Sequence, residues 1–121
     1  MKSLLIVAHG SRREASNEEV RKLAEQIRAM PDLPVDEMAT AFLELAEPSI
    51  PEGAEACIQR GADEVLVFPY FLAVGRHVVE DIPAEIAKVQ DKYPKASIHI
   101  TSHLGSAVDL PALIAATALQ K

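Results

Sequence analysis

The chain has 121 residues, of which 49% are hydrophobic and 25% are charged, a composition typical of one folded domain rather than of a disordered or collagen-like chain. Its formal net charge of −6 argues against nucleic acid as a partner, because a protein surface that binds the phosphate backbone needs an excess of positive charge. Cys57 is the only cysteine, which excludes an internal disulfide and fits a reducing, cytoplasmic compartment. No apolar run reaches the roughly 18 residues of a membrane span, so we expect no membrane partner.

Apolar and helical patterns alternate along the chain. The apolar run 3–8, followed at once by His9 and Gly10, predicts a strand buried on both faces rather than an export signal. Three later segments are predicted as strands, at 35–43, 64–68 and 96–101, although Asp36 and Glu37 make the start of the first irregular. Helix-start patterns predict four helices, which begin near Ser16 with Glu19, Ser49 with Glu52, Asp81 with Pro83, and Asp109 with Pro111.

The resulting order, βαβαβαβα, predicts an α/β fold over residues 1–121, a single domain with a four-stranded parallel sheet flanked by helices. Three connections, 9–16, 43–49 and 69–81, follow the carboxyl ends of strands. Because ligands of open α/β sheets bind at those ends, we expect the three connections to meet at one edge and to form the functional site.

Two histidines and one acid stand on these connections. His9 comes directly off the first strand, Glu44 ends the second, and His77 lies in the apolar connection after the third. Imidazole and carboxylate groups are suitable ligands for iron, cobalt, nickel or zinc, and three protein ligands with open positions are typical of a catalytic rather than a structural site. Each residue alone also fits an ordinary loop or packing role, and Glu47 is an alternative to Glu44.

Residues suited to an organic anion stand nearby. Ser11 and Arg12 precede a predicted helix, and Arg76 adjoins His77, an arrangement that favours acidic groups of a ligand although a solvated basic turn has the same pattern. An apolar stretch that a solvated loop would not contain is available to cover a ligand face; it consists of Phe71, Leu72, Ala73 and Val74.

The two remaining histidines are weaker candidates. His99 and His103 are four residues apart, but their segment has the pattern of a strand running into a loop, so the spacing does not bring them to one helix face. We expect His99 to be structural or on the surface and His103 to lie at the site's edge as a peripheral substrate contact.

Several blocks of the sequence resemble the sirohydrochlorin chelatases, the class II chelatase family, and specifically its small single-domain cobaltochelatase form. The similar blocks occur in order over nearly the whole chain: 4–12 (LLIVAHGSR), 42–50 (FLELAEPSI), 61–65 (GADEV), 69–72 (PYFL), 75–77 (GRH) and 81–83 (DIP). The segment after His103 is less similar.

The resemblance implies a chelatase-like, flavodoxin-like fold. The longer relatives hold two such domains around one cleft, so this chain would correspond to one half of them. It also implies a homodimer with the active site between subunits, His9 and His77 as catalytic metal ligands, and Glu44 at the family's acidic position. The implied reaction inserts a divalent metal (Co²⁺, or else Fe²⁺ or Ni²⁺) into a sirohydrochlorin-type tetrapyrrole, with no cofactor beyond that metal.

Two other functions remain open from the residues. A histidine-dependent phosphatase would use His9 and the following arginines, but Ala8 stands where an arginine would complete the phosphate site. A non-catalytic metal-delivery or tetrapyrrole-binding protein would use the same residues without insertion.

Overall fold

The computed structural model describes residues 1–120, with the side chains of residues 77 and 79 outside the description. Its strands are β1 (Lys2–Ala8), β2 (Glu37–Phe42), β3 (Glu64–Pro69) and β4 (Ser97–Ile100). Its helices are α1 (Glu14–Arg28), α2 (Ile50–Gln59), α3 (Arg76–Lys92), the short 3₁₀ helix η1 (Leu104–Ser106) and α4 (Leu110–Ala118). Among these residues, no helix is both long and apolar enough to cross a bilayer.

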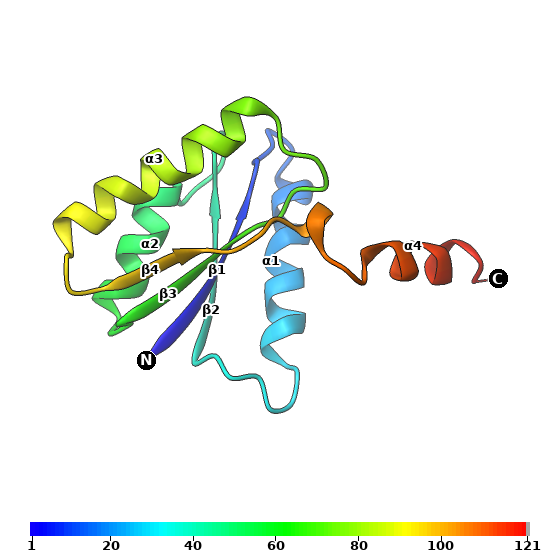
Figure 1. The fold of residues 1–121 in the computed structure, drawn as a ribbon, viewed down its shortest axis with the longest axis horizontal. Coiled ribbons are helices and arrows are strands. Elements are labelled where there is room, and N and C mark those ends of the chain that lie inside the picture. Colours follow the sequence, from blue (N-terminus) through cyan, green and yellow to red (C-terminus); the bar gives the residue numbers. More distant parts are fainter. Residues whose placement is uncertain (121) are drawn as a thin grey trace.

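The four strands form one parallel sheet in the order β2-β1-β3-β4 (Figure 1). This confirms the predicted α/β class and the parallel four-stranded sheet. The central strand β1 is buried on both faces because α2 and α3 pack on one side and α1 on the other.

Two apolar clusters, one on each face, form the core. The larger cluster lies under α2 and α3 and includes Leu5, Val67 and Ile82. The smaller cluster lies under α1, around Ile6 and Phe42. Alternate residues of one strand serve opposite faces, as the strand period of two requires.

Two predicted helix starts are wrong. The first helix begins at Glu14 rather than after Ser16, since Arg13 is its N-cap. Helix α3 begins at Arg76 rather than near Asp81, and it contains Pro83. The cause of the earlier start in α3 is apolar packing at helical spacing. The side chains that face the core are Val78, Ile82, Ile86 and Val89. Their packing offsets the loss of the backbone hydrogen bond that Pro83 cannot donate.

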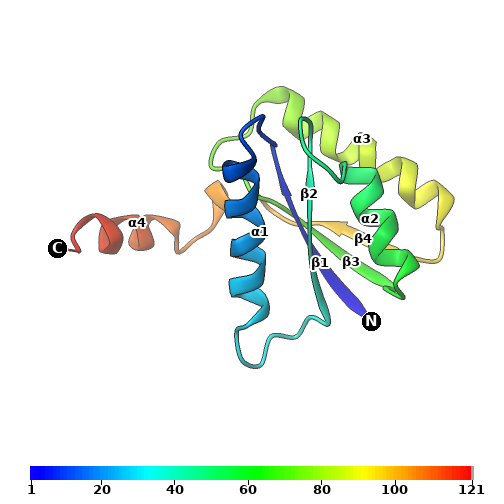
Figure 2. The ribbon, with the colours of Figure 1, turned by 180° about the vertical axis from the view of Figure 1, so that it is seen from behind.

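The last helix differs from the expected arrangement. We expected helices to flank the sheet, but α4 extends beyond η1 away from the rest of the fold, as both opposite views show (Figures 1 and 2). None of its residues is buried. The sheet therefore has two helices on one face and only α1 on the other.

Candidate functional site

The carboxyl ends of β1, β2 and β3 are joined by backbone hydrogen bonds that continue past the strands. Leu43 N–H donates to Ala8 O (2.9 Å), and Glu44 N–H donates to His9 O (3.0 Å). Tyr70 N–H donates to Val7 O (2.8 Å). The connections after these three strands thus begin at one edge of the sheet, as predicted from the parallel order.

Gly10 allows the first two connections to approach this closely. Its φ of 95° lies in the region that favours glycine. A Cβ placed on Gly10 would lie 1.8 Å from Glu44 O, which is far inside van der Waals contact. A glycine at this position is therefore required for the backbone contact that sets His9 beside Glu44.

The structure brings His9 and Glu44 together as an open pair. His9 Nε2 lies 3.6 Å from Glu44 Oε1, longer than a hydrogen bond, and the two side chains are 57% and 58% exposed. Both groups therefore have coordination or proton-accepting capacity left for a ligand. Such a pair provides an imidazole nitrogen and a carboxylate oxygen from two strand ends.

His77 is the second residue of α3, but its side chain lies outside the described part of the structure. The described side chains contain no group of three His, Cys, Asp or Glu residues close enough to hold a metal ion. The predicted third ligand therefore stays a prediction.

A cavity of about 300 Å³ adjoins Glu44. Two further carboxylates, Asp81 and Glu85, line it together with Glu44. Sequence reasoning missed both acids, although their spacing of four residues places them on one face of α3. The wall of the cavity is thus acidic on the α2–α3 side of the candidate site.

Asn17 was also missed, and it holds the connection after His9 in place. Its side chain is buried, accepts a hydrogen bond from Ser11 N–H (2.9 Å) and donates one to Ser11 O (2.8 Å). Ser11 Oγ accepts from Arg13 N–H (3.0 Å). These contacts explain why α1 begins before Ser16: the turn at Ser11 is fixed by a residue inside the helix.

The predicted basic residues lie at two helix starts. Arg12 is exposed just before α1, while Arg76 is the first residue of α3 and is 91% exposed. The Arg76 side chain approaches Glu80 to 3.5 Å, one turn along the helix. An exposed pair of this kind contributes little energy, so Arg76 remains available to an anionic ligand.

The apolar stretch 71–74 is divided between two surroundings. Phe71 packs against the larger core cluster, whereas Leu72 and Ala73 are exposed. Leu72 lines a cavity of about 250 Å³ with Tyr70 and Leu104, and Val74 lines another of about 160 Å³ that includes His103. The exposed part available to cover a ligand is therefore Leu72 and Ala73, not the whole stretch.

A backbone contact from η1 supports this stretch. Gly105 N–H donates to Phe71 O (3.0 Å). A Cβ on Gly105 would lie 1.7 Å from Leu72 O. The segment after β4 thus holds the connection between β3 and α3, because β3 and β4 are neighbours in the sheet.

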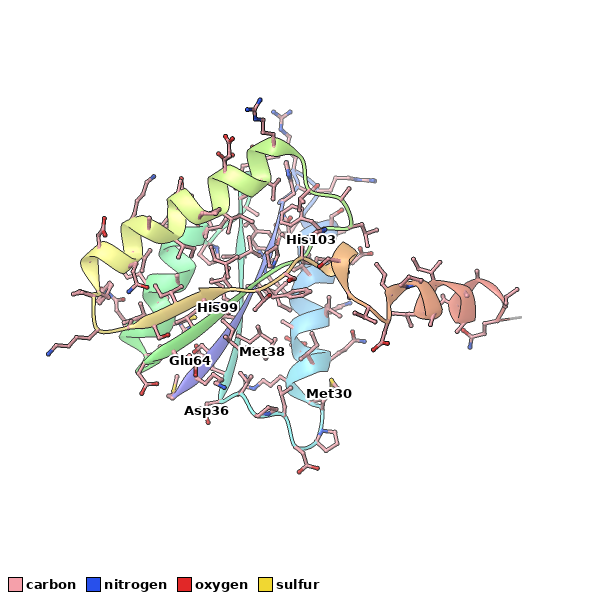
Figure 3. All side chains as sticks on the ribbon, viewed as in Figure 1. Met30, Asp36, Met38, Glu64, His99 and His103 are labelled. Atoms are coloured by element: carbon pink, nitrogen blue, oxygen red, sulfur yellow. The ribbon has the colours of Figure 1, made fainter. Side chains whose placement is uncertain are left out.

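The other predicted residues fall as follows. His99 is exposed on β4 (Figure 3), in agreement with a surface position. His103 is half-buried just before η1. Glu47 is exposed, and Cys57 is fully buried in the larger core cluster.

The chain belongs to the CbiX family, whose model residues 3–120 match. It is 38% identical, over 81% of its length, to the sirohydrochlorin ferrochelatase of Priestia megaterium, but it covers only 36% of that protein. It is 35% identical to the sirohydrochlorin cobaltochelatase of Sulfolobus acidocaldarius, covering 87% of this chain and 80% of that one.

A solved structure shares the fold. The crystal structure of the sirohydrochlorin chelatase SirB from Bacillus subtilis subspecies spizizenii, in complex with cobalt, has a TM-score of 0.83 and 31% identity to this chain. The match covers 97% of this chain and 49% of that protein. The chain therefore spans about half of this structure, and less than half of several curated relatives.

Proposed function

We propose that residues 1–121 form a single domain that inserts a divalent metal into a sirohydrochlorin-type tetrapyrrole. Cobalt is the metal we favour, with iron and nickel as the other candidates, and the metal is a substrate rather than a resident cofactor. The observation that carries the proposal is the His9–Glu44 pair, 3.6 Å apart at the carboxyl edge of the sheet in a member of the CbiX family.

The reaction has two chemical demands. The incoming M²⁺ must lose bound water, and the two pyrrole N–H protons must leave, so that the products are the metallated ring and two protons. His9 and His77 bind the metal or accept these protons, because a neutral imidazole does either near pH 7. Glu44 completes the metal's ligands or accepts a proton from His9.

The remaining site residues bind the ring. Ser11, Arg12 and Arg76 contact its peripheral carboxylates, since guanidinium groups and helix starts favour anions. Leu72 and Ala73 cover one face, with Phe71 and Val74 supporting them. Bending the ring tilts its nitrogen lone pairs toward the metal, and binding energy elsewhere on the ring offsets that distortion.

The active form that we propose is a homodimer with the site between subunits. The open character of the His9–Glu44 pair supports this, because more than half of each side chain faces solvent and a second surface would enclose the ring. Local arginines, rather than the net charge of −6, orient an acidic substrate at physiological salt, where screening acts over about 8 Å.

Metal insertion into sirohydrochlorin, followed by visible absorbance under anaerobic conditions, tests the proposal. With Co²⁺, we expect His9→Ala, His77→Ala and Glu44→Gln each to lower the rate, the first by at least about 100-fold, because each removes a group that handles metal or proton. The matched control is Glu19→Gln on the exposed side of α1, which should leave the rate unchanged.

The same assay separates the other functions. Tight binding of metal or tetrapyrrole without insertion by the wild-type chain would identify a delivery protein. Hydrolysis of a generic phosphate ester that is lost in His9→Ala would identify a phosphatase. Rates equal to wild type in both histidine variants would refute the assigned site, and parallel reactions with Fe²⁺ and Ni²⁺ rank the metals.

A further inference from the structure

The connection after β1 is attached to the rest of the fold at two separate points. At the first point, backbone contacts join His9 and Gly10 to Glu44, in the connection after β2. At the second point, the side chain of Asn17 joins Ser11 to helix α1. The two attachments share no hydrogen-bonding group, because one comes from β2 and the other from α1. Loss of the second attachment therefore leaves the first in place.

Asn17 is a polar side chain in the interior, and its amide is used on both sides. Only 2% of its surface is exposed. Its Oδ1 accepts a hydrogen bond from Ser11 N–H, while its Nδ2 donates to Ser11 O (2.8 Å) and to Glu14 Oε2 (3.4 Å). Burial of an amide is costly unless its donors and acceptors find such partners. The turn at Ser11 and the buried position of Asn17 thus stabilise each other.

The partners of Asn17 require an amide rather than a carboxylate of the same shape. An ionised carboxylate at this position could still accept from Ser11 N–H, but it could not donate to Ser11 O. It would also lie beside the carboxylate of Glu14, which Arg21 already binds. The change Asn17→Asp therefore breaks the donor half of the attachment with almost no change in side-chain shape.

The second attachment determines the orientation of two groups that suit anions. Ser11 Oγ accepts from Arg13 N–H (3.0 Å), so its own hydroxyl hydrogen is left to donate to a ligand. Arg12 follows in the chain and is exposed. Both residues lie just before the N-terminus of α1, where the helix dipole favours negative charge. The turn that Asn17 holds thus presents hydrogen-bond donors and a cation rather than metal ligands.

We propose that Asn17 is a positioning residue for the tetrapyrrole, and that it acts through Ser11 and Arg12 without affecting the metal. This inference rests on the proposed function, in which those two residues bind peripheral carboxylates of the ring. His9 and Glu44 keep their own attachment when the Asn17 amide is lost. The connection after β1 is thereby divided into a metal-handling part at His9 and a ring-binding part at Ser11 and Arg12.

Steady-state metal insertion tests this division, because it separates ring binding from turnover. We expect Asn17→Asp to raise the KM for sirohydrochlorin at least about tenfold and to change kcat less than about twofold, since a loss of uniform binding affects KM alone. Fluorescence titration with the metal-free ring should show the same fold loss of affinity. Calorimetric titration with Co²⁺ should give the wild-type affinity, because the His9–Glu44 pair keeps its separation.

Val20→Ala is the matched control for a general weakening of α1. Val20 lies three residues after Asn17 and belongs to the smaller core cluster, so its truncation loosens the helix without removing a contact to the turn. We expect this variant to unfold at lower urea concentration with its KM unchanged. Asn17→Ala removes the same hydrogen bonds without adding a charge, and it provides the test if Asn17→Asp folds poorly.

Combination with Ser11→Ala shows whether Asn17 acts through the turn. The rise in KM of the double variant Ser11→Ala, Asn17→Asp should be smaller than the product of the two single rises, because both changes disturb one set of contacts. Independent, multiplying effects would overturn the proposal. So would a wild-type KM in Asn17→Asp, or an equal rise of KM in Val20→Ala.

The metal titration separates this proposal from the proposed function. A lower kcat or a weaker Co²⁺ affinity in Asn17→Asp would place Asn17 with the metal-handling part and overturn the proposal, while wild-type insertion would leave the chelatase function intact. If the wild type binds the ring without metallating it, the two titrations decide alone. A wild-type chain that neither binds nor metallates sirohydrochlorin would refute the proposed function, and the positioning role with it.

Discussion

Single residues set the separation of His9 and Glu44, and Gly10 is the most restrictive of them. Its positive φ and the contact of its α-carbon with the Glu44 carbonyl act together. Any side chain at this position forces the connections after β1 and β2 apart. The distance between the imidazole and the carboxylate is thus determined by a residue that carries no functional group.

A comparison of two glycines separates the close contact from backbone strain. Gly61 also has a positive φ, 116°, but nothing lies within 4 Å of a Cβ built there. We expect Gly61→Ala to cost about 1 kcal/mol of unfolding free energy through strain alone, and Gly10→Ala to cost at least about 2 kcal/mol. Metal insertion should fall at least about tenfold in Gly10→Ala only, because small displacements of reacting groups are costly. Equal activity in both variants would contradict this role.

At the residue scale, the sequence predicted the candidates that adjoin strand ends and missed those that act across the fold. His9 and Glu44 follow apolar runs directly, so the parallel order alone brings their connections together. Gly105 acts through Phe71 and Leu72, more than thirty residues earlier, and no local pattern specifies such a contact. Asn17 acts from inside α1 on the turn at Ser11 before it, and the capping pattern at Ser16 and Glu19 does not indicate that contact.

At the scale of elements, local sequence patterns predicted some helix starts correctly, and other contacts moved the rest. At α2 the predicted capping box is confirmed: Glu52 N–H donates to Ser49 Oγ (3.3 Å), and Ser49 N–H donates to Glu52 Oε1 (3.0 Å). At α1 the Ser16 pattern was wrong, because Asn17 fixes a turn that begins the helix earlier. At α3 the Asp81–Pro83 pattern was wrong, because core packing extends the helix by five residues before it. Local capping patterns predict a helix start only where no other contact, whether a nearby side chain or core packing, favours a different one.

The capping box should have a measurable effect on stability. We expect Ser49→Ala to lower the free energy of unfolding by about 1 kcal/mol, because a backbone N–H at the start of α2 loses its acceptor. Asp109→Ala is the control: Asp109 occupies the N-cap of α4 but makes no side-chain hydrogen bond there, so little change should follow. Urea titration of the two variants measures the difference, and equal losses would argue against the cap.

For the whole molecule, the alternation of strands and helices predicted the parallel sheet but not its order. The order β2-β1-β3-β4 puts β4 at one edge and leaves its α1 side uncovered. The position of α4 was not predictable either, since its apolar composition indicates burial without saying against which surface.

Acid stability of the fold should depend on the pair that joins β2 to α2. Arg60 holds Glu37 through two hydrogen bonds of 2.7 and 2.9 Å, and these bonds lower the pKa of Glu37 below its ordinary 4.5 despite partial burial. A lowered folded-state pKa means stabilisation above pH 4.5 that disappears as the pH falls through the folded value.

Replacing Glu37 tests this dependence. We expect Glu37→Gln to lower the unfolding free energy by about 1 kcal/mol at pH 7. At an acid pH below the lowered folded-state pKa of Glu37, the wild type approaches the variant because its own carboxyl becomes protonated. Glu25→Gln, on the exposed side of α1, should show no such convergence. A loss that is the same at both pH values would assign the effect to packing instead of charge.

The contact of Gly105 with the connection after β3 has a consequence for how such chains can vary. Two segments more than thirty residues apart share one hydrogen bond and a carbonyl in direct contact with an α-carbon. Lengthening either segment by one residue would shift the other, so insertions at 70–75 and at 103–106 should be tolerated only together. The edge position of β4 thus makes the last fifth of the chain a partner in shaping the connection between β3 and α3.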